Sequence, residues 1–365
     1  MPPVARPVPG ARDGVDDVDN RWCSAAAAAA ALALAGTLTA CSSDGGQEAA
    51  RKRFYVSLGD SLAVGVQPRA DGTPEQTSQG YPDALYRILY DRDSTLAHKR
   101  LGCGGEDTTS FVHGNLERCA ERYEEGSQLA QAERFLRRNR AHTSLVTVGI
   151  GANNFTGCVL DGAQGTDGAQ ESDGEGSGHG DSDAASGSGP EPAQRLEVDR
   201  ECVDKGMRRL RAEMPVIAAR LRDAAGPDVQ IIGMNYYNPF LAALLLEDGA
   251  AGGGSPGEGA QSGGESGGGG AQSELVDYAT GVFTEMNAVI TESYTEAGID
   301  VADVAEAFQS SDSEVPEDSE TGMPTNVQRI CDYTWMCNTA RGPDIHTNQA
   351  GATEIAETFA EQVKA

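Results

Sequence analysis

Short apolar segments alternate with longer helix-like segments along the chain, and this alternation limits the choice of fold more than any other feature. Four apolar segments are predicted to be strands: residues 54–58, 144–154, 229–239 and 298–304. Five segments with a helical pattern are predicted to be helices: residues 81–90, 127–140, 203–223, 274–296 and 350–363. Such alternation is typical of a parallel sheet with helices on both faces, in which sites form beyond the carboxyl ends of the strands.

The first predicted strand stops abruptly at Gly59-Asp60-Ser61. Glycine adopts backbone angles that other residues avoid, and aspartate and serine both favour helix N-caps, so a strand-to-helix turn is predicted here. A serine at such a turn lies near unpaired backbone N–H groups that can hold a developing oxyanion. Ser61 is therefore either a cap or a nucleophile. Asn153 and Asn235 also follow predicted strand ends, and this grouping favours the nucleophile.

A serine nucleophile needs a base, which is usually a histidine. His346 stands in the loop sequence RGPDIHTNQAG, with Asp344 two residues before it and a predicted helix after it. A carboxylate beside an imidazole fixes its tautomer and stabilises the imidazolium, so His346 is the best candidate for the base. The other histidines lie in acid-rich sequence, ahead of predicted strands or after a glycine-rich loop: His179, His98, His142 and His113.

The N-terminal segment is predicted to be an export signal. Residues 24–41 are apolar, alanine-rich and too short for a good membrane span, which is typical of the core of a signal peptide. The ending Leu-Thr-Ala-Cys at 38–41 resembles a bacterial lipobox, which implies lipidation of Cys41; the alternative is an ordinary secretory signal. We therefore expect a signal at 1–41, a linker at 42–52 and one domain at 53–365, anchored outside the cytoplasmic membrane or secreted.

Two segments do not fit the predicted sheet and helices. Residues 161–191 and 247–273 are rich in glycine, serine and acids and almost free of apolar residues, so we expect disordered insertions. The formal charge of −28 over 365 residues argues against nucleic acid and against electrostatic docking on anionic lipid. We expect no metal, no cofactor, no membrane contact beyond the lipid anchor, and a monomer.

Six cysteines remain when Cys23 and Cys41 are set aside, and an even number in an exported chain suggests disulfides. Six cysteines permit fifteen pairings, of which sequential pairing is the simplest. It gives these bridges: Cys103–Cys119, Cys158–Cys202 and Cys331–Cys337. A zinc site is the rival interpretation, but no Cys-x-x-Cys spacing is present.

Four blocks in fixed order resemble the motif blocks of the GDSL/SGNH hydrolases. They are GDSL at 59–62, LGCGGEDTTSF at 101–111, GANN at 151–154 and DIH at 344–346. The sequences MNYYNPFLA, TWMC and DIHTNQAG are similar to the actinobacterial secreted lipase/esterase branch. The resemblance covers about residue 53 to the end, apart from the insertions. It implies a flavodoxin-like α/β/α sandwich with a central parallel sheet and a lipase or esterase that forms an acyl-enzyme on carboxylic esters of lipids or small alcohols.

The resemblance also implies roles for individual residues. Ser61 would be the nucleophile and His346 the base, and the oxyanion would be held by the N–H of Ser61, the N–H of Gly105 and the Asn153 side chain. The glycine block carries an extra residue, which leaves Gly104 as an alternative. The family's acid lies three residues before the histidine, where this chain has proline, so either Asp344 or a backbone carbonyl would orient His346. Two other functions stay open, a carbohydrate O-acetyl esterase and a non-catalytic surface-binding lipoprotein.

Overall fold

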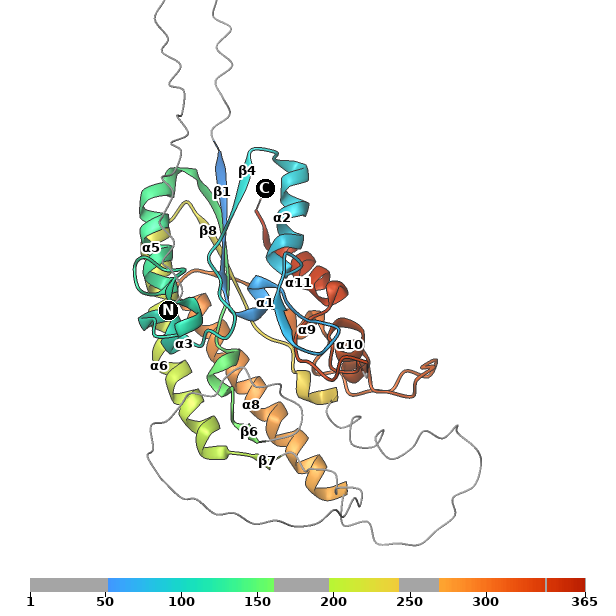
Figure 1. Cartoon of the computed structure of the whole chain (residues 1–365). Helices are drawn as coiled ribbons and strands as arrows, with labels where there is room; N and C mark the ends of the chain where they lie inside the picture. Colours follow the sequence, from blue (N-terminus) through green and yellow to red (C-terminus); the bar gives the residue numbers. More distant parts are fainter. Residues whose placement is uncertain (1–51, 161–196, 243–268, 339, 365) are drawn as a thin grey trace, which may run out of the picture. The chain divides into compact units, whose positions relative to one another are not determined.

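A five-stranded parallel sheet lies between two layers of helices (Figure 1). The computed structural model describes residues 52–160, 197–242, 269–338 and 340–364. The strand order is β4-β1-β5-β8-β9. The strands are β1 (Arg53–Gly59), β4 (Leu96–Arg100), β5 (Thr143–Gly149), β8 (Gln230–Met234) and β9 (Asp300–Ala302). The expected α/β/α sandwich with a central parallel sheet is confirmed.

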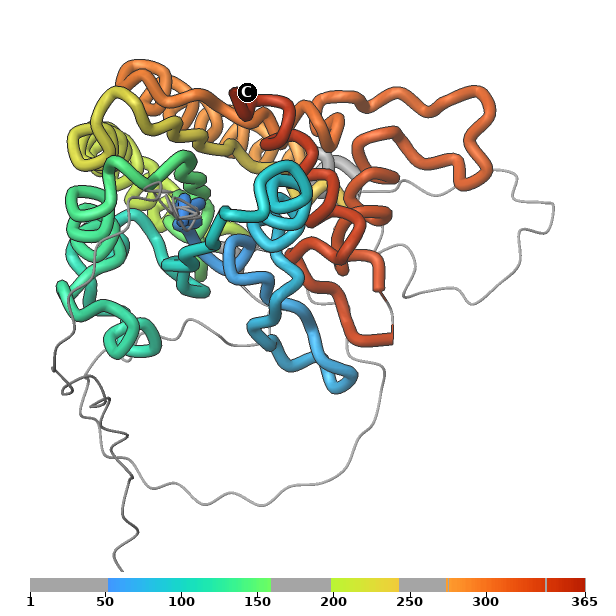
Figure 2. Tube along the Cα trace, turned by 90° about the horizontal axis from the view of Figure 1, so that it is seen from above, coloured from blue at the N-terminus to red at the C-terminus, as the bar shows by residue number. Residues whose placement is uncertain are grey.

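Five long helices cover the sheet. They are α2 (Tyr81–Arg92), α5 (Gln128–Asn139), α6 (Arg200–Ala225), α8 (Gly269–Glu296) and α11 (Gln349–Gln362). Helices α5, α6 and α8 pack in sequence on one face, whereas α2 and α11 pack side by side on the other, as Figures 1 and 2 both show. Because both faces are covered, Tyr55, Val56 and Leu58 of β1 are all fully buried.

Strand β4 is not predicted from the sequence. Its sequence LAHKR has little apolar character, because β4 lies at the edge of the sheet and pairs only with β1. His98, which we expected ahead of a strand, lies within this one. Its imidazole stacks on Tyr55 at 4.5 Å and its Nε2 lies 2.8 Å from Ser57 Oγ. Burial lowers the pKa of His98 to about 3, so this histidine is a neutral part of the core.

Shorter elements connect the strands and the long helices. The hairpin β2 (Val66–Pro68) and β3 (Pro74–Gln76) follows helix α1 (Ser61–Val64). The others are α3 (Thr108–His113), α4 (Glu117–Ala120), η1 (Arg140–His142), η2 (Ala152–Phe155), η3 (Pro239–Ala242), α9 (Val304–Ala307) and α10 (Thr325–Tyr333). Within the described residues no helix is long and apolar enough to cross a membrane.

All three expected disulfides are present, with Cα–Cα distances of 6.1, 5.3 and 5.0 Å in chain order. Cys158–Cys202 joins the two ends of the first predicted insertion, beside the antiparallel pair β6 (Val159–Leu160) and β7 (Glu197–Val198). Most of both insertions, the predicted signal and Cys41 lie outside the described residues.

Helix α8 starts earlier than the helix predicted at 274–296. Helix α8 begins at Gly269, so residues 269–273 belong to a helix instead of the insertion. Alanine and glutamine, which occupy 271 and 272, are good helix formers and allow the helix to extend backwards from the apolar pattern that predicted it.

Candidate functional site

Ser61 is the first residue of helix α1, immediately after strand β1. The turn depends on Gly59, whose φ is +135° and where a Cβ would lie only 2.3 Å from the carbonyl oxygen of Gly149. The N-cap is Asp60, because its Oδ1 accepts the N–H of Leu62 at 3.0 Å. The Ser61 hydroxyl is therefore not needed as the cap, which was the alternative to a nucleophile.

The end of β1 is also held from helix α5. The Gln128 side chain accepts the N–H of Gly59 at 2.6 Å and donates to its carbonyl at 3.1 Å. The Gln128 amide is buried and bonds both backbone groups of Gly59, so it fixes the direction in which the chain leaves the strand. The position of the serine turn is thus set by two neighbouring elements, α5 and β5.

His346 lies in the loop before α11, and Asp344 contacts it directly. Asp344 Oδ1 lies 2.7 Å from His346 Nδ1 and also accepts the backbone N–H of His346 at 2.7 Å. Burial works to raise the pKa of Asp344, but the hydrogen bonds and charge of His346 outweigh it and lower that pKa. An ionised carboxylate on Nδ1 leaves Nε2 as the nitrogen that can accept a proton from a serine.

The loop that carries His346 is tied down at several points. The N–H of Trp335 donates to the carbonyl of His346 at 3.0 Å, and the Tyr237 hydroxyl donates to the carbonyl of Ile345 at 2.7 Å. The Gln67 side chain bridges the Trp335 indole and the carbonyl of Thr347, at 2.9 and 2.8 Å. Because each neighbour of His346 is held, the imidazole has little freedom to leave its place.

Asn153 lies in η2, just beyond the end of β5. Its Nδ2 donates to the carbonyl of Glu106 at 2.9 Å, and its Oδ1 accepts the Thr156 hydroxyl at 3.2 Å. These two contacts fix which side of the amide carries the nitrogen. An amide nitrogen has two hydrogens, so one remains available to an oxyanion.

The two candidate glycines lie in the loop that follows β4. A Cβ on Gly104 would lie 3.9 Å from the Cα of Ser61, whereas one on Gly105 would face the guanidinium of Arg118 at 3.3 Å. Gly104 therefore lies against Ser61, and neither glycine lines the pocket described below. The assignment of Gly105 to the oxyanion hole stays a prediction.

Two other residues that the sequence placed near strand ends serve the fold. The Asn235 side chain donates to Asp303 at 2.8 Å and accepts the N–H of Ala305, so it joins β8 to α9 outside the pocket. Asn154 is buried and its amide bonds both the N–H and the hydroxyl of Thr108. It fixes η2 to α3.

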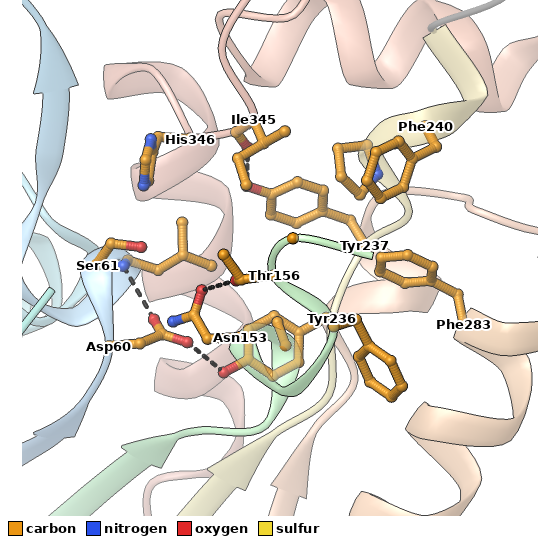
Figure 3. Close-up of a pocket in the computed structure, with 15 residues that line it drawn as sticks. Asp60, Ser61, Asn153, Thr156, Tyr236, Tyr237, Phe240, Phe283, Ile345 and His346 are labelled. Atoms are coloured by element: carbon orange, nitrogen blue, oxygen red, sulfur yellow. Dashed lines mark hydrogen bonds between the residues drawn. The ribbon is translucent and has the colours of Figure 1, made fainter. Parts of the chain in front are cut away.

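Ser61, Asn153 and His346 line one pocket of about 710 Å³, a volume that includes its open mouth (Figure 3). Asp60, Ser61 and His346 lie on one side, and the rings of Tyr237, Phe240 and Phe283 lie on the other. The remaining lining includes these residues: Leu62, Ala152, Phe155, Thr156, Gly157, Tyr236, Pro239 and Ile345. Sequence reasoning missed this aromatic side, because Phe240 and Phe283 come from segments that no local pattern connects.

Two buried carboxyls near the pocket have raised pKa values. Burial raises the pKa of Asp60 to about 6, against the hydrogen bond that Tyr236 donates to its Oδ2 at 2.8 Å. Burial also raises the pKa of Glu106 to about 8. At neutral pH Asp60 is therefore mostly charged and Glu106 mostly neutral. Of these two carboxyls, the charged one is Asp60, which is adjacent to Ser61 in the chain.

Comparison with known proteins gives a family and several solved structures of limited similarity. The model of the GDSL-like lipase/acylhydrolase family matches residues 57–353. An extracellular lipase from Streptomyces rimosus is 14% identical with a TM-score of 0.43, and phospholipase A1 from Streptomyces albidoflavus NA297 is 16% identical with a TM-score of 0.42. Each alignment covers 86% of this chain and 100% of the other. The M. smegmatis aryl esterase is 12% identical with a TM-score of 0.37, over 85% of this chain and 98% of its own. No curated protein matches the sequence significantly.

Proposed function

Because this chain belongs to the GDSL-like lipase/acylhydrolase family, we propose that it hydrolyses carboxylic esters through an acyl-enzyme on Ser61. The observation that carries the proposal is the 2.7 Å contact of Asp344 with His346 Nδ1, in a loop that lines the same pocket as Ser61. A serine, a histidine and a carboxylate in this relation are the groups that nucleophilic acyl transfer needs.

The proposed reaction begins when Ser61 Oγ attacks the ester carbonyl and passes its proton to His346 Nε2. The negative charge on the carbonyl oxygen would be held by the Ser61 N–H, the second hydrogen of Asn153 Nδ2 and a glycine N–H of the 104–105 loop. His346 then gives the proton to the departing alkoxide. Water, activated by the same imidazole, would release the acid and restore Ser61.

The pocket lining supports an apolar acyl group. Its tyrosine and threonine hydroxyls donate within the protein: Tyr236 to Asp60, Tyr237 to Ile345 and Thr156 to Asn153. Few donors are left for the hydroxyls of a sugar, and burying these against aromatic rings would be costly. The rings of Tyr237, Phe240 and Phe283 offer apolar surface to an acyl chain longer than acetyl. We therefore favour lipid or aryl esters over sugar O-acetyl groups.

Hydrolysis of p-nitrophenyl esters of increasing chain length tests the function and the acyl preference together. Burial of one methylene contributes about 0.8 kcal/mol, so kcat/KM should rise about fourfold per carbon until the pocket is full. Phe283→Ala should flatten this rise. The control Tyr278→Ala changes another α8 aromatic that does not line the pocket, and it should leave the rise intact. Highest activity on acetate would favour the O-acetyl esterase.

Covalent labelling distinguishes catalysis from the non-catalytic binding alternative. A fluorophosphonate probe should label the wild type and leave Ser61→Ala unlabelled, because only an activated serine reacts. Equal labelling of both proteins would remove Ser61 from the mechanism. No labelling and no hydrolysis by folded wild-type protein would support a binding module.

We also propose that the protein is lipid-anchored outside the cytoplasmic membrane. The proposal rests on the apolar segment at 24–41 and its lipobox-like ending. Cells fed a labelled fatty acid should label the wild type and the control Cys23→Ala, and should not label Cys41→Ala. Release of unlabelled wild-type protein into the medium would favour ordinary secretion.

A further inference from the structure

Asp60 is a buried carboxylate whose oxygens both have fixed partners. It is only 3% exposed. Oδ1 caps helix α1 through the N–H of Leu62, and Oδ2 accepts the Tyr236 hydroxyl at 2.8 Å. A cap needs only one oxygen, and serine or asparagine caps equally well without a charge. The cap therefore does not explain why a charged group is buried next to Ser61.

Tyr236 is itself held in place from helix α8. Asn287 accepts the backbone N–H of Tyr236 at 2.9 Å and donates to its carbonyl at 2.7 Å. The Tyr236 ring is 3% exposed, and its hydroxyl points at Asp60 beneath Ser61 (Figure 3). A side chain fixed by two backbone hydrogen bonds and by burial delivers its single donor to one acceptor.

We propose that Asp60 is a second carboxylate that stabilises the protonated form of His346, and that Tyr236 is the positioning residue that keeps this carboxylate charged. Asp344 contacts the Nδ1 atom of His346, whereas Asp60 lies on the side of Ser61 that faces away from His346 (Figure 3). Asp60 and His346 line the same pocket on either side of Ser61 (Figure 3), and the charge of His346 is one of the effects that lower the pKa of Asp60. This inference rests on the proposed function, in which His346 becomes an imidazolium during acyl transfer.

The other titratable groups around Asp60 cannot supply the same effect. The groups that feel its charge are Tyr81 of α2, Tyr294 of α8, and Tyr236 and Tyr237 after β8. Burial raises the pKa of all four phenols, so they remain neutral across the working range. His346 is thus the group facing Asp60 whose charge changes during the reaction, and Asp344 faces His346 from its own loop.

The pH profile of kcat/KM, measured on p-nitrophenyl butyrate, tests the inference. Tyr236→Phe removes one hydrogen bond from Asp60, so Asp60 should protonate about one pH unit higher. The acid limb of the profile should move up with it, giving roughly threefold lower kcat/KM near pH 6 and convergence with wild type by about pH 8. A merely structural role would lower activity equally at every pH.

Two further variants complete the test. Asp60→Asn keeps the cap oxygen and removes the charge, so kcat/KM should fall on the order of tenfold even at pH 8. Tyr294→Phe is the matched control, because this buried hydroxyl has no hydrogen-bond partner among the described residues. Its pH profile should match that of the wild type.

Carbon-13 NMR of the aspartate carboxyls gives a readout that does not require turnover. Asp60 should titrate higher in Tyr236→Phe and also in His346→Ala, because each change removes a group that lowers its pKa. An unchanged Asp60 titration in His346→Ala would overturn the inference, as would a Tyr236→Phe loss that is independent of pH. Absence of hydrolysis with a shifted titration would reject the proposed function and retain the coupling.

Discussion

The geometry of Asp344 predicts different losses for two substitutions at that position. One oxygen, Oδ1, accepts both the backbone N–H of His346 and its Nδ1–H, each at 2.7 Å. The first contact is a turn in which an aspartate accepts the N–H two residues on. That turn brings the carboxylate to the imidazole although the acid lies one residue closer in sequence than the family pattern.

Asp344→Asn should remove only part of the contribution that Asp344 makes to kcat. Asparagine can place its own Oδ1 where both N–H groups converge, which keeps the tautomer and the ring orientation. What is lost is the charge, and a charge-assisted hydrogen bond exceeds a neutral one by about 1–2 kcal/mol. That difference corresponds to roughly 5- to 30-fold in kcat. Asp344→Ala removes the acceptor as well and should cost on the order of 10³- to 10⁴-fold, close to His346→Ala.

The measurement is kcat on p-nitrophenyl butyrate for wild type, Asp344→Asn, Asp344→Ala and His346→Ala. Circular dichroism and thermal melting show that each variant is folded. Equal and complete loss in the asparagine and alanine variants would refute the argument that one oxygen accepts both bonds. Near-normal turnover of Asp344→Ala would show that a backbone carbonyl orients His346.

The sheet could be predicted from the sequence because its central strands are buried on both faces. The segments containing β1, β5 and β8 are continuous apolar runs, and helices on both faces require that composition. Strand β4 has one partner and a polar sequence, so local pattern does not distinguish it from a loop. The start of α8 was also missed, because its first turn lies outside the apolar periodicity that marks the rest.

The pocket likewise combines residues that a local sequence motif indicates with residues that only the packing of distant segments brings together. The place of Ser61 and Asn153 at one pocket could be predicted because each follows a strand end within its own local motif, and that of His346 because an acid stands beside it. The Asp60–Tyr236 contact joins residues 176 positions apart, and Phe283 reaches the pocket from a third element. Such contacts depend on how α8 and the end of β8 pack, which propensity and periodicity do not encode.

Three further predictions concern stability and the covalent frame. The pKa of Asp60 is about 6 in the folded protein against 3.8 unfolded, so wild-type stability falls as pH rises between these values. Asp60→Asn should therefore gain up to about 3 kcal/mol of unfolding free energy at pH 7 and nothing at pH 3, measured by urea titration. Deletion of residues 162–188 should leave melting temperature and hydrolysis nearly unchanged, because that segment offers no apolar surface to a core. Cys331–Cys337 encloses the segment whose backbone pairs with the His346 loop, and closing six residues contributes ~2 kcal/mol in the loop-entropy model. The double variant Cys331→Ser with Cys337→Ser should keep the far-ultraviolet spectrum of the wild type and lower kcat more than it raises KM, because the loop holding His346 loses its closed support. An unchanged kcat in the folded double variant would show that the Trp335 and Gln67 contacts hold that loop without the disulfide.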